Sequence, residues 1–217
     1  MDWYQPINIY CERQIIGFWA EPVNALTNLA FIFSGLFMAF KTQTDKFSFF
    51  LSIQIILIGI ASFIFHTFAN PIGGLLDTAS IFFFGTTYVY CANRRFLHLN
   101  WLTSIFIAML LAPFSLIISF FTILLVGELN GSAWYSSFLI LFLTYSFILR
   151  NRMLDVSRAF FYCACFFAVS IFFRSIDEAV CNSFSLGTHF MWHILNGFLL
   201  GVLVWVMYLS RKFQIDT

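Results

Sequence analysis

The sequence has few charged residues. Only 10% of its 217 residues are Asp, Glu, Lys or Arg, the formal net charge is +1, and 61% are apolar, including 32 phenylalanines. So little charge excludes an ordinary soluble domain and is typical of a membrane protein. The nearly neutral balance also provides no basic surface for nucleic acid. We therefore expect a membrane protein with no nucleic-acid partner and no evident obligatory protein partner.

The sequence also lacks a polar segment long enough for a soluble domain. Apolar runs that can cross about 30 Å of hydrocarbon recur near 22–40, 47–66, 72–92, 101–121, 132–149, 156–173 and 187–209. They predict an all-α fold, a bundle of seven transmembrane helices in one domain, residues 1–217. Pro113, inside the long uncharged stretch 99–127, is expected to kink the fourth helix.

No basic segment precedes an apolar run within the first twenty residues, so we expect no cleavable signal peptide and a permanent first span. Basic residues favour the cytoplasmic ends of spans. If the N-terminus lies outside, the outer segments carry only Arg13 and Arg174. The inner segments then carry nine basic residues, namely Lys41, Lys46, Arg94, Arg95, Arg150, Arg152, Arg158, Arg211 and Lys212. We therefore predict an outside N-terminus and a cytoplasmic C-terminus.

Three of the four histidines converge on the predicted outer face. His189 and His193 head the last apolar run, and their spacing of four places them on one helix face. His66 ends the second run, and Asp77 lies near the start of the third. Three neutral imidazoles can hold a catalytic zinc and leave its fourth position to water, whose pKa then falls towards about 7. The pattern therefore predicts a zinc centre.

Other residues near these histidines have candidate roles. Asp77 is a candidate general base for a zinc-bound water that attacks an amide carbonyl, passing the proton to the leaving amine. Ser62, one turn before His66, is either an oxyanion donor or a helix-packing residue. Trp192 either lines the pocket or belongs to the interfacial aromatic belt. A single membrane histidine can instead bond neighbouring helices, and His98 is interpreted as a surface residue.

These motifs together resemble the alkaline ceramidase family. The matching residues are Tyr10-Cys11-Glu12, Ala20-Glu21-Pro22 with Asn24 and Asn28, Ser62-Phe63-Ile64-Phe65-His66, Asp77, and Gly187-Thr188-His189-Phe190-Met191-Trp192-His193 with Asn196. The resemblance is closer to the bacterial branch, within a seven-helix superfamily that includes the adiponectin receptors.

The resemblance implies a zinc amidase that hydrolyses ceramide or a similar N-acyl lipid to a long-chain base and a fatty acid. It implies a bacterial inner membrane location, with the site near the periplasmic face. It also implies specific roles: zinc ligands at His66, His189 and His193, support of the chemistry by Asp77 and Ser62, and a wall of the site at Trp192.

A calcium site is a further implication of the resemblance. Animal members carry one near the first helix, and Glu12 and Glu21 resemble two of its ligands. Asn8 stands where an aspartate is expected, and the two glutamates are more closely spaced. Calcium prefers several hard, often charged oxygen ligands. The alternatives are a weakened calcium site, or polar packing between helices by Glu21 together with Asn24 and Asn28.

The five cysteines divide into two groups. Cys91, Cys163 and Cys165 lie in or near apolar runs and are interpreted as small apolar residues. Cys11 and Cys181 both fall on the predicted outer side, where an oxidising compartment would allow them to pair. The sequence leaves open whether they do.

Arg174 and Asp177, at the outer end of the sixth run, are candidates for an ion pair or for contact with a substrate headgroup.

Three other functions compete with the amidase. A seven-helix receptor or signalling protein with a structural zinc would usually need a soluble extension, and none is evident. Haem ligation suits facing histidines better than a pair four residues apart. A serine peptidase of the Gly-x-Ser-x-Gly type lacks its motif here.

Overall fold

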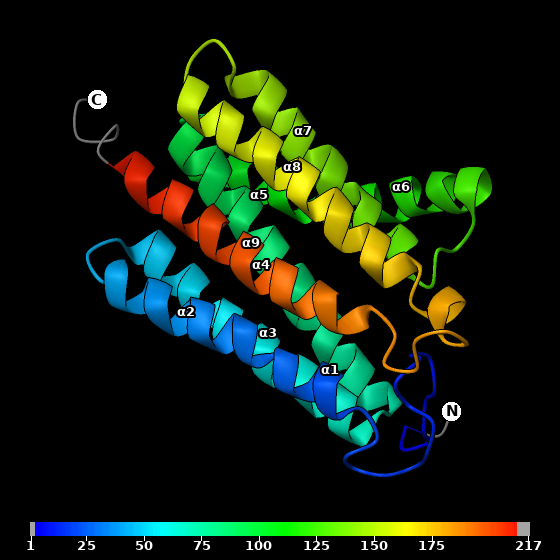
Figure 1. Cartoon of the computed structure of the whole chain (residues 1–217). Helices are drawn as coiled ribbons and strands as arrows, with labels where there is room; N and C mark the ends of the chain where they lie inside the picture. The colour runs from blue at the N-terminus through cyan, green and yellow to red at the C-terminus, as the bar shows by residue number, and fades with distance from the viewer. Residues whose placement is uncertain (1–2, 212–217) are drawn as a thin grey trace.

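The computed structural model describes residues 3–211, which form a bundle of helices (Figure 1). Within this range, seven helical spans are long and apolar enough to cross a membrane, and no strand occurs. The predicted all-α, seven-span fold is therefore confirmed. Lys212, one of the nine basic residues used to predict the topology, lies outside the described residues.

The helices follow one another as α1 (Pro22–Thr27), α2 (Leu29–Lys41), α3 (Lys46–Phe68), α4 (Pro71–Phe96), α5 (Trp101–Met109), α6 (Leu111–Val126), η1 (Ser132–Tyr135), α7 (Ser136–Leu149), α8 (Leu154–Ser175), η2 (Glu178–Val180) and α9 (His189–Leu209). Three spans are composite, because α1 continues into α2, α5 into α6, and η1 into α7. Most observed ends differ from the predicted ones by a few residues.

The fourth span is bent where its proline requires it. Helix α5 ends at Met109 and α6 begins at Leu111. Proline lacks an N–H, and its ring clashes with the carbonyl four residues earlier, which for Pro113 is that of Met109. The predicted kink is therefore present, just before the proline. The span continues to Val126, beyond its predicted end at residue 121.

Short polar side chains start three of the helices. Asp45, Asn70 and Asn100 each precede a helix and accept a hydrogen bond from the backbone N–H three residues later, at 2.8–2.9 Å. Such N-caps satisfy N–H groups that have no partner inside the helix. They define where α3, α4 and α5 begin.

Helix α9 runs through the centre of the bundle, in contact with α2, α3 and α8. Its approach to α2 depends on Gly197, where a Cβ would lie 2.8 Å from a backbone carbon of Ala30. Real Cβ contacts are not this short, so a larger residue would force the two helices apart. Helices α2 and α9 are therefore closely packed at this point.

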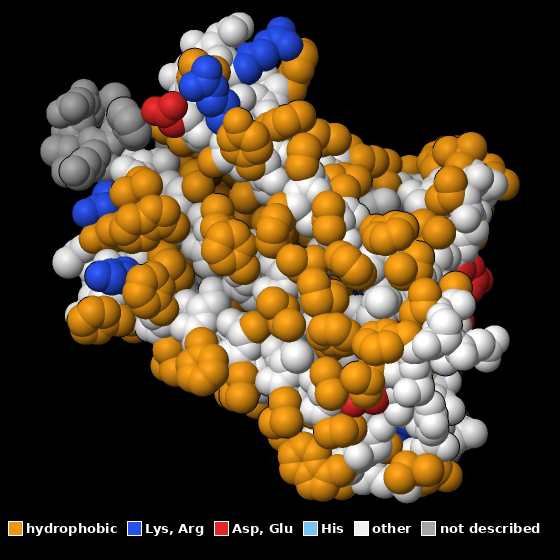
Figure 2. All heavy atoms as spheres, viewed as in Figure 1, with side chains coloured by type: hydrophobic (Ala, Val, Ile, Leu, Met, Phe, Trp, Pro, Cys, Tyr) orange, Lys and Arg blue, Asp and Glu red, His pale blue; other side chains and the backbone are white. Residues whose placement is uncertain are grey.

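The two ends of the bundle differ. Apolar side chains cover the middle of the face in Figure 2, while Lys and Arg gather at the end that carries the α7–α8 loop and the end of α9. At the opposite end, the N-terminal segment 3–21 and the α8–α9 connection 176–188 lie together (Figure 1). The end of α3 and the starts of α4 and α9 lie beneath this cover.

Candidate metal centre

Three histidines from two helices meet at the covered end of the bundle. His66 lies in the last turn of α3, His189 is the first residue of α9, and His193 follows one turn later. Their ligand atoms all lie within 4.8 Å of one another. Each residue is only 1% exposed. The structure thus brings together the three histidines that the sequence singled out.

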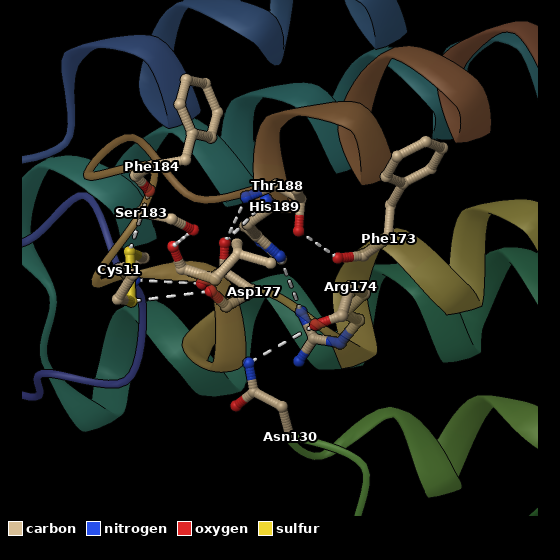
Figure 3. The surroundings of a disulfide bond; sticks show 11 residues. Cys11, Asn130, Phe173, Arg174, Asp177, Ser183, Phe184, Thr188 and His189 are labelled. Carbon is tan, nitrogen blue, oxygen red and sulfur yellow. Dashed lines mark hydrogen bonds between the residues drawn. A yellow bond between two sulfur atoms is a disulfide. The ribbon is translucent and has the colours of Figure 1, made fainter.

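Asp177 fixes the position of His189. Its Oδ1 accepts hydrogen bonds from the backbone N–H groups of Thr188 at 2.7 Å and His189 at 2.9 Å, and its Oδ2 accepts one from Cys11 at 3.0 Å (Figure 3). A carboxylate at a helix N-terminus satisfies free N–H groups and interacts favourably with the helix dipole. The ion pair considered for Arg174 and Asp177 is not formed, because this carboxylate caps α9 instead.

Two of the imidazole rings are oriented through Nδ1. The Nδ1 of His66 lies 2.6 Å from Oε2 of Glu21, and the Nδ1 of His193 lies 3.0 Å from Oγ1 of Thr27. Hydrogen bonds of this kind fix the tautomer and the ring orientation of metal-binding histidines. Both partners belong to the beginning of the first span, so α1 holds ligands from α3 and α9 in place.

The three histidines fit a zinc ion. The Nε2 of His66 is buried and has no hydrogen-bond partner among the described residues. Buried polar atoms are almost always satisfied, and a metal ion would satisfy this one. Three neutral imidazoles are a donor set found in catalytic zinc sites. With Nδ1 bonded to Glu21, His66 is left with Nε2 as its ligand atom.

Glu21 remains ionised beside His66. Burial alone would raise the pKa of this carboxyl, but its hydrogen bond with His66 and its ion pair with Arg13 outweigh that effect, and the pKa is lowered. The Arg13 Nε donates to Oε1 of Glu21, and its Nη2 donates to the backbone carbonyl of His66 at 3.0 Å. Arg13 therefore ties the N-terminal segment to the end of α3.

The residues considered for calcium do not fit that ion. Glu12 accepts hydrogen bonds from the first backbone N–H groups of α1, at 2.7 and 2.8 Å. Burial raises its pKa, although these two N–H groups reduce the rise. Asn8 is exposed, and the Arg13 guanidinium already provides a cation beside Glu21. The alternative of polar packing fits better, since Asn24 donates to Glu21 at 3.2 Å.

Asp77 and Ser62 also lie at this centre. Asp77 is in the second turn of α4, and its Oδ1 is buried without a partner among the described residues. Its neighbours are His66, Arg174 and the hydroxyl of Ser62. Asp77 thus lies beside the histidines, and Ser62 lies one turn before His66 on α3.

Trp192 faces the interior. It is 5% exposed, and its ring centre lies 4.7 Å from that of Tyr135 and 5.8 Å from that of Phe167. It lines a narrow apolar cavity of about 50 Å³ inside the bundle, together with Phe84 and Leu203. A place in an interfacial belt does not agree with this burial. A wall of the histidine site stays a prediction, because none of the three histidines lines this cavity.

Several contacts of the centre were not predicted. Tyr10 stacks on His189 with ring centres 3.8 Å apart, and Arg174 Nη1 lies 2.9 Å from the Tyr10 hydroxyl and 3.3 Å from His189 Nδ1. Thr27 was missed although it borders the polar stripe of Glu21, Asn24 and Asn28, a signal that could have identified it. The pairing of Arg13 with Glu21 has no comparable sequence signal.

Cys11 and Cys181 form a disulfide, with Cα atoms 5.4 Å apart. This resolves the alternative that the sequence left open. The bond joins the N-terminal segment to the connection before α9, as Figure 3 shows, and so holds the cover over the histidines. Cys91 and Cys163 are buried in the spans, in agreement with their interpretation as apolar residues, whereas Cys165 is exposed.

Comparison with known proteins agrees with this geometry. A family model described as ceramidase matches residues 7–216, nearly the whole chain and every residue of the centre. Among curated proteins, no match is found. Because the family model spans the N-terminal segment, all seven helices and the three histidines, the chain belongs to the ceramidase family.

Proposed function

We propose that this protein is a zinc-dependent amidohydrolase that cleaves the amide bond of ceramide or a similar N-acyl lipid, releasing a long-chain base and a fatty acid. Membership of the ceramidase family supports amide hydrolysis and a lipid substrate. The observation that carries the zinc dependence is the buried group of three histidines, with the unpaired Nε2 of His66 among their ligand atoms.

In this proposal a zinc ion supplies Lewis acidity and a nucleophilic water at neutral pH. Asp77 accepts the proton of the attacking water and delivers it to the nitrogen of the leaving amine. Ser62, a neighbour of Asp77, donates a hydrogen bond that orients the carboxylate before the attack. Once Asp77 is protonated, the Ser62 hydroxyl is released to donate to the developing oxyanion.

The residues around the ligands preorganise the centre. Glu21 and Thr27 restrict the rings of His66 and His193 through Nδ1. Asp177 holds the backbone of His189. Correct placement before the reaction removes part of the entropic cost of reaching the transition state. We therefore assign these three residues a positioning role.

We further propose that the N-terminus lies outside, in the periplasm of a bacterium, and that the centre is near the outer face of the inner membrane. Lys and Arg gather at the end away from the histidines (Figure 2), which favours the cytoplasm for that end. The disulfide between Cys11 and Cys181 lies at the histidine end, where an oxidising compartment would preserve it.

The apolar cavity beside Trp192 is the candidate site for the start of the acyl chain while that chain still belongs to the uncleaved substrate. It extends into the bundle between α3, α4, α7, α8 and α9, and its lining is almost entirely aliphatic or aromatic. Asn196 provides one polar group there and donates hydrogen bonds to Ser170 and to the backbone of Trp192. A slender alkyl chain is the substrate part that suits these surroundings.

The test is to measure zinc content and fatty-acid release from ceramides of several chain lengths, using detergent-purified wild type and Asp77→Asn. We expect stoichiometric zinc in both proteins, and a loss of turnover of about 100-fold or more in the variant, the usual contribution of a general base. Asp155→Asn, an exposed aspartate at the start of α8, is the matched control and should remain active.

Two results would contradict the proposal. A wild-type protein that binds no zinc would show that hydrolysis does not depend on zinc. A fully active Asp77→Asn variant would show that Asp77 is not the general base. Zinc without release from any ceramide would instead favour the alternative of a receptor or signalling protein with a structural metal.

A further inference from the structure

Arg174, in the last turn of α8, is a buried cation without a paired anion. It is 8% exposed, and none of the three ion pairs among residues 3–211 includes it. Asp77 interacts with its charge but lies beyond ion-pair distance. The Nε of Arg174 is also buried without a hydrogen-bond partner. A buried charge is costly unless it is paired, so the arrangement indicates that an anion binds here.

The neighbours of Arg174 position the cation without neutralising it. Its guanidinium lies 5.3–5.5 Å from the ring centres of Tyr10, Tyr135 and Trp192. Its Nη1 donates to the Tyr10 hydroxyl at 2.9 Å. Aromatic faces attract a cation through their quadrupole but carry no net charge.

The contact of Arg174 with His189 does not persist when His189 binds a metal. A guanidinium can only donate hydrogen bonds, so His189 Nδ1 must accept at this 3.3 Å contact. If a metal binds Nδ1, the lone pair is used. If it binds Nε2, the proton of the neutral ring resides on Nδ1. In either case His189 has no lone pair for Arg174, and a donor is released beside the metal centre.

A second cavity, of about 510 Å³, reaches Arg174 from the side of the bundle. It forms where α6 departs from α4: α5 packs against α4, whereas α6 turns to pack on α7 and η1 (Figure 1). The kink before Pro113 produces this departure. The lining includes Thr78, Phe82, Ser115, Leu116, Trp134 and Tyr135. The cavity thus joins an opening between α4 and α6 to a buried cation.

We propose that Arg174 binds the carboxylate of a long-chain fatty acid whose alkyl chain occupies the α4–α6 cavity, and that the fatty acid formed at the centre leaves for the membrane by this route. The inference rests on the proposed function. Hydrolysis breaks the amide C–N bond, places the water's hydroxyl on the acyl carbon, and gives the amine the protons it needs to leave as an ammonium. The remaining carboxylate is the kind of anion that a guanidinium binds with two parallel hydrogen bonds.

Equilibrium binding of radiolabelled palmitate to the detergent-purified, zinc-loaded protein tests the proposal without turnover. We expect Arg174→Gln to raise the dissociation constant at least tenfold and Arg174→Lys to restore part of the affinity. Hexadecanol, which has the same chain and no charge, should bind the wild type and both variants alike. Equal loss of palmitate and hexadecanol affinity in Arg174→Gln would indicate a structural role and overturn the proposal.

A second pair of variants tests the route without changing Arg174. Leu116 and Ile117 are neighbours on α6 and are each 56% exposed, but only Leu116 is among the residues that line the cavity. Leu116→Trp should slow palmitate dissociation or weaken its binding several-fold, and Ile117→Trp should have no effect. Equal behaviour of the two variants would exclude the route. Palmitate binding that depends on Arg174 in a protein that hydrolyses no ceramide would contradict the proposed function and leave this site intact.

Discussion

The Oε2 of Glu21 lies 2.6 Å from the Nδ1 of His66, although 45 residues separate them in the sequence. The other carboxylate oxygen of Glu21 pairs with Arg13. Glu21 is thus both the partner of a candidate metal ligand and the anion that balances a buried cation. The beginning of the first span therefore takes part in building the metal centre.

Replacing Glu21 with glutamine should weaken zinc binding about 10- to 100-fold, the range found when the hydrogen-bond partner of a ligand is changed. The amide cannot balance Arg13, and it orients His66 less firmly. Competition with a chromophoric chelator measures the affinity. Glu178→Gln, an exposed glutamate in η2, is the control. Equal zinc affinity in both variants would show that Glu21 does not support the metal.

Removal of calcium should leave the protein unchanged. Calcium binds to oxygen ligands. The Arg13 guanidinium already occupies two of the oxygens near the start of the first span, because it donates hydrogen bonds to Glu21 and to the His66 carbonyl. We expect EGTA to change neither the melting temperature nor turnover, and 1,10-phenanthroline to abolish turnover. Loss of activity in EGTA that added calcium restores would show that these residues do bind calcium.

The sequence predicted the core of the site because its parts obey simple rules. Span length and the placement of basic residues put His66, Asp77 and His189 at one end, and helical spacing added His193. Ionisable residues inside membrane spans are costly and usually have a function, so these four side chains are identifiable as candidates from the sequence. The prediction assumed that the second and seventh spans lie side by side, and α3 and α9 are in contact in the structure.

The roles in the centre that could not be predicted from the sequence depend on contacts between distant segments. Neither Tyr10 nor Arg13 lies in a span. Their contacts with His189 and Glu21 depend on the conformation of residues 3–21 in the folded protein. Asp177 is a candidate for an ion pair with Arg174 or for contact with a substrate headgroup by sequence, but the free N–H groups at the start of α9 compete successfully for its carboxylate. Sequence spacing gives no measure of that competition.

Loss of the disulfide should destabilise the cover of the site. The bond closes a loop of 170 residues between Cys11 and Cys181, and native disulfides typically stabilise by about 2–4 kcal/mol. Cys11 also donates its N–H to Asp177, which positions the start of α9. We expect the double serine variant to melt at lower temperature and to lose zinc faster during dialysis.

Cys165→Ser is the control for this experiment, because Cys165 is exposed and unpaired. It should melt and retain zinc as the wild type does. If the double variant matches the control in both measurements, the disulfide has no role in holding the site.

Acid should remove the contribution of a second buried network, at the opposite end. Asp45 accepts hydrogen bonds from Arg95 at 2.6 and 2.9 Å. Burial alone would raise the pKa of Asp45, but the hydrogen bonds from Arg95 and Ser48 more than offset this, and the pKa is lowered. The stabilisation is therefore fully present above the ordinary aspartate pKa of about 3.9 and is lost as the pH falls through the lower folded-state value.

Asp45→Asn should accordingly destabilise the protein by about 3 kcal/mol at pH 7, since it leaves Arg95 buried without its partner. Thermal unfolding of wild type and variant across pH measures the effect. The two curves should stay apart down to about pH 4 and converge only as the pH falls below the lowered folded-state pKa of Asp45. A difference that stays constant down to acid pH would show that the ionised pair is not the source of the stability.

The central claim is that His66, His189 and His193 hold the zinc on which turnover depends. The most direct measurement is the zinc content of purified His193→Ala together with its rate of fatty-acid release from ceramide. His98→Ala, which changes an exposed histidine at the other end, is measured alongside it. We predict that His193→Ala loses zinc and turnover together while His98→Ala keeps both. Full turnover in a zinc-free His193→Ala protein would contradict the account.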